Sequence, residues 1–175
     1  MKKIILFFAA IVMVAGFSNT VVAQTTANVD NNATATIIAP IGITAGADLA
    51  FGNIIKGAGD VTVDVNGTRT ISASMKPGNQ NGTITAGVFN VSGEAAYTYT
   101  ITLPANDVVT ITDGSDPMDV NDFNCFTATD NDAGVSGTLN GSGTDVITVG
   151  ATLTVAADQA TGAYTGTFNV TVAYN

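Results

Sequence analysis

Residues 162–175 read GAYTGTFNVTVAYN, and this stretch decides the fold class. Large side chains occupy every second position toward its end: Phe168, Val170, Val172 and Tyr174. Successive side chains of a β-strand point to opposite faces, so the alternation predicts one long strand over 164–174 with an apolar face on the core. That face needs a second layer to cover it, and we expect Leu49 and Phe51 among its neighbours.

The same two-residue period recurs along the chain, and no segment has the 3.6-residue period of an amphipathic helix. Further strands are expected over 34–38, 49–52, 61–65, 68–74, 83–91, 97–103, 108–112 and 146–155. Asn66 and Gly67 predict a tight hairpin turn, whereas residues 113–129 are expected to be irregular. About ten short strands separated by turns predict an all-β fold, an immunoglobulin-like or pilin-like β-sandwich, with a closed barrel as the alternative.

The composition excludes several classes of function. The 175 residues include 14 acidic and 5 basic side chains, one cysteine and no histidine. Without histidine the chain has no Ser-His-Asp triad and no histidine-ligated zinc site. Glu94 is the only glutamate, which disfavours a carboxylate pair for glycoside hydrolysis. The acidic excess argues against nucleic acid and anionic membranes as partners. We therefore expect a protein that is not an enzyme.

The N-terminus has the layout of a secretory signal peptide. A basic start precedes an almost wholly apolar run over 4–17, and small residues lead up to Ala23. This run is shorter than the ~20 residues that a transmembrane helix needs, so it predicts a cleaved signal over 1–23 rather than a membrane span. We expect export to the periplasm, the cell surface or the medium. The mature chain is expected to have a flexible extension over 24–32 and a single β-sandwich domain over 33–175.

Aspartates are the main candidates for metal ligands. Six of them fall in the region expected to be irregular or just after it: Asp113, Asp116, Asp119, Asp122, Asp130 and Asp132. Carboxylate oxygens suit Ca²⁺, but the calcium-loop pattern is missing and aspartate is also an ordinary turn residue, so both interpretations stay open. Cys125 stands between aromatic residues with no basic neighbour, which indicates a buried thiol rather than a reactive one.

The C-terminal stretch resembles the terminal motif of chaperone–usher pilin subunits, with a glycine fourteenth from the end and a penultimate tyrosine. In such a subunit the last strand borders a groove that a strand from a chaperone or from the next subunit completes. The resemblance implies other subunits or a periplasmic chaperone as partners. It also implies a partner-strand motif made of Gly162, Phe168, Val170, Val172 and Tyr174.

The chain from about 33 to 175 also resembles an uncharacterised family of exported bacterial domains. That family is catalogued only as a domain of unknown function and is similar in pattern to the spore coat U type of secreted, pilin-like protein. The motifs that carry the resemblance include ADLAFG at 47–52, YTYTITLP at 97–104 and GAYTGTFNVTVAY at 162–174. It implies an immunoglobulin-like fold, surface display and no catalytic residues.

These observations together predict a non-enzymatic, exported structural or adhesive surface protein, in the form of a pilin-like subunit. The alternative is a free-standing ligand-binding β-sandwich module that binds Ca²⁺ through its aspartates. No other cofactor is expected.

Overall fold

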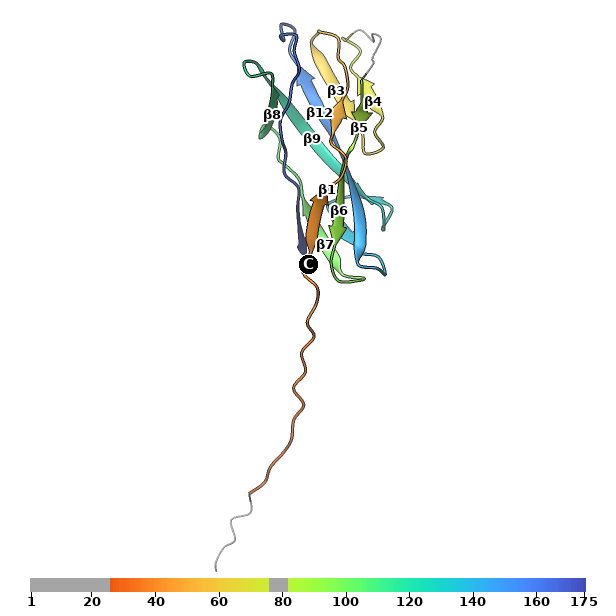
Figure 1. The fold of residues 1–175 in the computed structure, drawn as a ribbon, viewed down its shortest axis with the longest axis vertical. Coiled ribbons are helices and arrows are strands. Elements are labelled where there is room, and N and C mark those ends of the chain that lie inside the picture. Colours follow the sequence, from red (N-terminus) through yellow and green to blue (C-terminus); the bar gives the residue numbers. More distant parts are fainter. Residues whose placement is uncertain (1–25, 76–81) are drawn as a thin grey trace, which may run out of the picture. The chain divides into compact units, whose positions relative to one another are not determined.

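The computed structural model describes residues 26–75 and 82–175, and the expected signal peptide over 1–23 lies outside this part. Of the described residues, 26–36 belong to one unit, and Ile37–Asn175 form a second, compact unit. In the first unit, residues 26–36 are exposed and belong to no strand. The regular structure of the described residues consists of thirteen strands without a helix (Figure 1), which confirms the all-β class.

The strands fall into three antiparallel sheets. The large sheet holds eight strands: β1 (Gly42–Ala45), β3 (Gly59–Val63), β4 (Arg69–Ile71), β6 (Gly87–Ser92), β8 (Val109–Thr112), β9 (Pro117–Thr127), β10 (Asp132–Ala133) and β12 (Thr144–Val155). The second sheet holds β7 (Thr98–Thr102), β11 (Ser136–Thr138) and β13 (Thr171–Tyr174), and the third holds β2 (Ala50–Phe51) and β5 (Ile84–Thr85). Strands β1, β6 and β7 lie at the end of the domain that carries the C-terminus, and β3, β4, β5 and β8 lie toward the other end (Figure 1).

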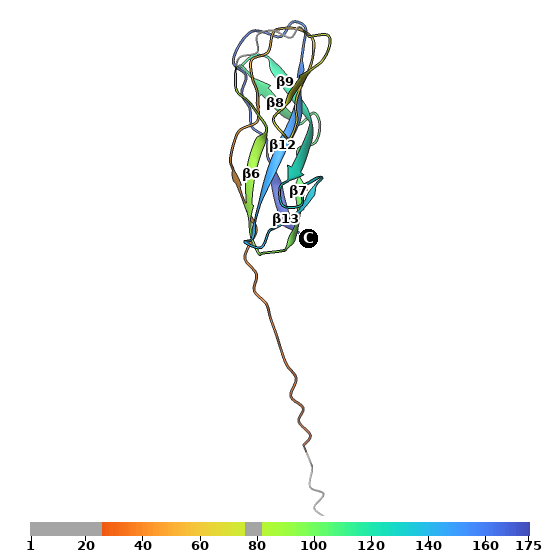
Figure 2. The same ribbon diagram turned by 90° about the vertical axis from the view of Figure 1, so that its right-hand side faces the viewer.

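Strand β12 is the axis of the large sheet and runs along the domain between β6 and β9 (Figure 2). Along one edge it pairs first with β6 and then with β3, and along the other edge it pairs with β9. The change from β6 to β3 occurs at Gly150, where an added Cβ atom would stand 2.5 Å from the carbonyl oxygen of Val63. A larger residue at this position would push β3 away from β12.

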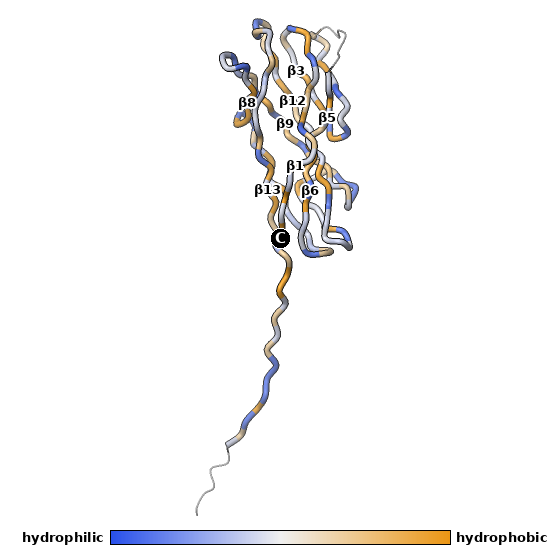
Figure 3. The backbone as a smooth tube through the Cα atoms, viewed as in Figure 1, coloured by the Kyte–Doolittle hydropathy of each residue, from blue (hydrophilic) through white to orange (hydrophobic). Residues whose placement is uncertain are grey.

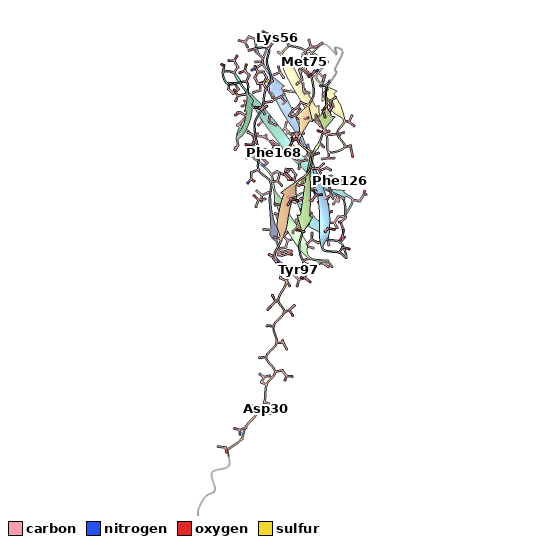
Figure 4. The ribbon with its side chains drawn as sticks, viewed as in Figure 1. Asp30, Lys56, Met75, Tyr97, Phe126 and Phe168 are labelled. Atoms are coloured by element: carbon pink, nitrogen blue, oxygen red, sulfur yellow. The ribbon has the colours of Figure 1, made fainter. Side chains whose placement is uncertain are left out.

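The second sheet packs across the large sheet, so the core lies between two layers. Tyr99 and Ile101 of β7 share one buried cluster with Ile147 and Val149 of β12. A second cluster toward the other end is built around three fully buried side chains: Val61, Ala151 and Leu153. Phe168 packs against both clusters and lies near the middle of the domain (Figure 4). Two facing layers make a sandwich-like arrangement, and the immunoglobulin-like assignment stays a prediction.

The prediction that residues 113–129 are irregular is wrong, because β9 spans eleven of these residues. Met118 faces the core near the start of β9, at an even-numbered position, whereas Cys125 faces it further on, at an odd-numbered position. Between them the register with β12 shifts, and Asp122 has a left-handed φ of 54°, as the extra residue of a β-bulge can have. The bulge exchanges the inward and outward positions, which breaks the two-residue period in the sequence.

The strand expected over 164–174 is only partly regular. Strand β13 covers its last four residues, and Thr165 makes an isolated bridge to Thr112 of β8. Between these points the chain passes from the edge of the large sheet to the second sheet, where β13 pairs with β7. The alternation is nevertheless confirmed, because the odd-numbered side chains are exposed and four even-numbered ones face inward: Phe168, Val170, Val172 and Tyr174. Leu49 and Phe51 pack on the same cluster as Phe168, as expected.

The start of the domain differs from the expectation as well. The short strand predicted over 34–38 is absent, and the first strand, β1, begins only after Pro40. Ile37 is 97% exposed, so nothing among the described residues covers the side chain that would have anchored that strand. The hairpin predicted at Asn66 and Gly67 is confirmed, because β3 pairs with β4 and Gly67 has a φ of 76°.

Candidate partner interface

Around the core at the C-terminal end, the paired strands form a nearly closed ring. From β1 the backbone pairing runs to β6, β12, β9 and β10. The chain between β10 and β11 joins the two sheets, because the Gly134 N–H donates to the Cys125 carbonyl of β9 and the Ile101 N–H of β7 donates to the Val135 carbonyl. From β7 the pairing continues to β13. Within the described residues no backbone hydrogen bond then joins β13 to β1.

We call the space between these two free edges, of β1 (Gly42–Ala45) and β13 (Thr171–Tyr174), the seam. The two strands lie side by side in Figures 1 and 3, and their Cα atoms approach to within 8 Å. A strand that pairs with both of them needs about 9.5 Å between β1 and β13, twice the usual spacing of neighbouring strands. The seam must therefore widen by at least about 1.5 Å where the two strands are closest before a strand can enter.

The side chains behind the seam are apolar. Ile43 of β1 and Val172 of β13 are half-buried and pack on the same core cluster. The Phe89 and Phe168 rings, which belong to the same layer of packing, meet edge to face with 5.8 Å between their centroids. Neither β1 nor β13 carries a charged side chain. Free backbone groups over an apolar floor without charge suit the pairing of an additional strand of low charge.

Three hydrogen bonds link β13 to the residues before β1 at the C-terminal end of the domain, one directly and two through Glu94, which lies between β6 and β7. The Tyr174 hydroxyl donates to the carbonyl oxygen of Ala39 at 2.9 Å and accepts the N–H of Glu94 at 2.6 Å. The Glu94 carboxylate in turn accepts the N–H of Ala39 at 2.9 Å. We call these three bonds the latch. Both backbone groups of Ala39 are thus held by side chains rather than by a neighbouring strand.

The structure gathers most of the predicted partner-strand motif at or behind the seam. Val172 and Tyr174 belong to β13 itself, Phe168 backs the seam, and Val170 is buried in the core. Gly162 is not part of this group, because it lies beside the Asp113 side chain, next to the β8–β9 turn. Sequence reasoning missed Ala39 and Glu94, and nothing in the local pattern singles out either residue.

The six aspartates that were candidates for calcium ligands are all exposed, and three of them make separate local hydrogen bonds. Asp113 holds the β8–β9 turn, where its carboxylate accepts the N–H groups of Asp116 and Ser115, and these bonds lower its pKa. Asp122 sits in the bulge of β9, and its N–H donates to the Asn106 side chain. Asp132 accepts the N–H of its neighbour in β10. Residues 26–75 and 82–175 contain no group of three acidic or cysteine side chains arranged to hold a metal ion.

Asp145 of β12 is the buried carboxylate among the described residues, and sequence reasoning missed it as well. Its Oδ2 accepts the Tyr99 hydroxyl at 2.8 Å, and its Oδ1 accepts the N–H and the hydroxyl of Thr129 at 2.9 and 2.8 Å. The N–H of Val146 also donates to Oδ1. Burial, followed by the bond to Asp145, raises the pKa of Tyr99 well above its usual range. Because both of its oxygens are hydrogen-bonded within the protein, this carboxylate fastens β7 to β12.

Cys125 and the surface hollows add no reactive site. Cys125 is buried, as predicted, its thiol donates to the Gly134 carbonyl at 2.9 Å, and burial raises its pKa. Two shallow hollows of about 370 and 290 Å³ lie beside Asp145 and beside the β3–β4 turn. Neither of them is lined by residues of β1 or β13.

Comparison with known proteins gives one match. Neither the curated proteins nor the solved structures contain a match to the chain. In the described part of the chain, no helix is long and apolar enough to cross a membrane. A family model does match residues 41–174, from the residue before β1 to the last residue of β13. The chain therefore belongs to the family described as Domain of unknown function (DUF4402).

Proposed function

We propose that this protein is an exported, non-enzymatic structural or adhesive subunit of a bacterial surface, and that it assembles by adding a strand at the seam. One observation carries the proposal: the backbone pairing around the core at the C-terminal end stops between β13 and β1. Two neighbouring edges without partners can pair with both edges of one incoming strand. The predicted signal peptide, the likeness to pilin subunits and spore coat U proteins, and the lack of histidine support the same function.

The strand that we propose for the seam is the N-terminal segment of another copy, residues 26–38. Its odd-numbered positions are apolar except for Asn31. The apolar ones are Ala27, Val29, Ala33, Ala35 and Ile37. Val29 is 92% exposed and Ile37 is 97% exposed. Asp30 is the only charged residue of the segment, so its entry brings little charge repulsion from an acidic protein. A strand from a periplasmic chaperone would use the same edges before assembly.

The test is assembly of the mature chain, residues 24–175. We expect a ladder of oligomers on a denaturing gel when the sample is not boiled, and a monomer after boiling, because paired strands resist detergent until they are heated. Deletion of 24–32 should abolish the ladder, and so should Ile37→Asn. The matched control is Thr36→Asn, at the neighbouring position with opposite side-chain direction, which should keep the ladder. A single cooperative monomer in sizing, with no ladder in any sample, would contradict strand donation between copies.

A further inference from the structure

The latch of Ala39, Glu94 and Tyr174 lies where the proposed strand would have to enter. We infer that the latch controls the seam: while its three bonds hold, β1 and β13 stay too close for a strand, and their release admits one. The inference rests on the proposed function for the identity of the entering strand, residues 26–38 of a second copy. The opening of the seam itself can be measured without any assembly.

Strand β1 is weakly attached apart from the latch. It has four residues and pairs only with β6, through one of its two edges. Pro40 lies between Ala39 and the strand and has no N–H to donate. The Tyr174 hydroxyl therefore provides the connection from β13 to the residues that lead into β1. Without this connection, β1 is held by its ladder with β6 and by the packing of Ile43 on the core.

The structure makes room for the latch at a specific residue. A Cβ atom added to Gly93 would overlap the Tyr174 hydroxyl oxygen and would come within 3.0 Å of the Leu139 side chain. The hydroxyl can reach the Glu94 N–H because Gly93 has no side chain. The Tyr174 ring is also fixed from outside, since it packs against the Tyr97 ring at 5.6 Å between centroids. Alanine at position 93 should therefore displace the hydroxyl while every hydrogen-bonding group of the latch is still present.

The latched and the strand-filled states exclude each other. In the latched state the Tyr174 hydroxyl lies within 2.9 Å of the Ala39 carbonyl, and the strands approach within 8 Å. A strand between them needs about 9.5 Å, and its own N–H and C=O groups would take the free edges of β1 and β13. A widening of about 1.5 Å is more than the bond from the Tyr174 hydroxyl to the Ala39 carbonyl can stretch, because hydrogen bonds weaken steeply beyond about 3.2 Å. The incoming strand must therefore compete with the latch.

The first experiment measures seam opening by hydrogen exchange and mass spectrometry, on the mature chain at a dilution where it is monomeric. Tyr174→Phe removes two of the latch bonds, Glu94→Ala removes the third, and Gly93→Ala displaces the hydroxyl. We expect the peptide 40–47 to exchange about three- to tenfold faster in each variant, the effect of losing one or two net hydrogen bonds. The peptide that covers β12 should not change, and it reports global unfolding if a variant folds poorly.

Two controls match the chemistry of the latch variants. Tyr97→Phe removes the hydroxyl of the ring that packs on Tyr174, and Asp119→Ala removes an exposed carboxylate from β9. Both should exchange like the wild type over 40–47. Unchanged exchange in Tyr174→Phe and Gly93→Ala, or equal acceleration in the controls, would overturn the latch.

The second experiment measures strand entry, with a fluorescently labelled synthetic peptide of residues 26–38 added to the same proteins. We expect the peptide to bind faster to the three latch variants than to the wild type, and the variants to form oligomers faster. Faster exchange without any peptide binding or oligomers would keep the latch and refute strand addition. Strand entry at equal rates in all proteins would refute the latch and leave the proposed function in place.

Discussion

Replacing Phe168 with alanine should destabilise the protein far more than a change on the opposite face of the same segment. The Phe168 side chain packs on both core clusters. Its ring centroid lies 5.8 Å from that of Phe89 and 5.1 Å from that of Phe123. Truncation would remove the side chain that joins the two halves of the core and would leave a cavity between the layers.

The magnitude follows from burial and from the two aromatic pairs. Truncation of a fully buried phenylalanine to alanine costs about 3–5 kcal/mol. Phe168 is half-buried, which lowers this value, whereas each lost aromatic pair adds about 0.5–1.5 kcal/mol. The two corrections oppose each other, so we expect a loss of about 3 kcal/mol in the free energy of unfolding. For a domain of this size that loss lowers the melting temperature by about 6–12 °C.

The assay is urea unfolding followed by circular dichroism, with the denaturant midpoint and the m value fitted separately. The matched control is Asn169→Ala, because Asn169 is the exposed neighbour and makes only a long side-chain hydrogen bond of 3.4 Å to Thr171. The control should stay within about 0.5 kcal/mol of the wild type. Equal losses in the free energy of unfolding at positions 168 and 169, with the m value unchanged, would refute the two-residue period. They would also refute the conclusion that the Phe168 side chain connects the two core clusters.

Four further outcomes are expected. Tyr99→Phe leaves the buried Asp145 without one of its donors and should cost about 1–3 kcal/mol in urea unfolding at neutral pH. Because the pKa of Tyr99 is raised in the folded protein, the unfolded chain ionises first, so wild-type stability should fall above about pH 10, more steeply than that of Tyr99→Phe. The buried Cys125 thiol, whose pKa is raised, should resist iodoacetamide until urea unfolds the protein, as mass spectrometry can show, and rapid labelling of the folded protein would mean that β9 opens. Calorimetry with millimolar Ca²⁺ should give no heat and no thermal shift, because the six exposed aspartates do not converge, and a saturable heat would restore the calcium-binding alternative.

The alternation at the C-terminus could be predicted from sequence because side-chain direction in an extended chain is a local property. Phe168, Val170, Val172 and Tyr174 face inward even where the ladder is interrupted. The ladder itself could not be predicted, because it depends on which distant strand lies alongside. Thr165 bridges to β8, whereas the last residues pair with β7, and no pattern within 164–174 records this change of partner.

Strand β9 shows a second limit. Because of the bulge at Asp122, the inward-facing side chains change from even-numbered positions, such as Met118, to odd-numbered ones, such as Cys125. The two-residue period is therefore broken within a continuous strand. Asp122 was a candidate metal ligand because it falls in the region that the sequence predicts to be irregular. In the structure its short side chain instead tolerates the left-handed backbone of the bulge. At the candidate interface, Tyr174 could be singled out from its penultimate position. Its partners Ala39 and Glu94 could not, because the contacts join residues 135 and 80 positions apart.

The contact between Tyr174 and Ala39 also means that the two ends of the compact unit meet. A short linker could join Asn175 to Ile37, and the chain could be opened instead in the turn between β11 and β12, at Asn140–Gly143, which belongs to no strand. Such a circular permutant would keep every strand ladder, since none of them includes the turn or the old termini. The fold would then be specified by which strands are paired. The order of the strands in the sequence could be changed without altering these pairs.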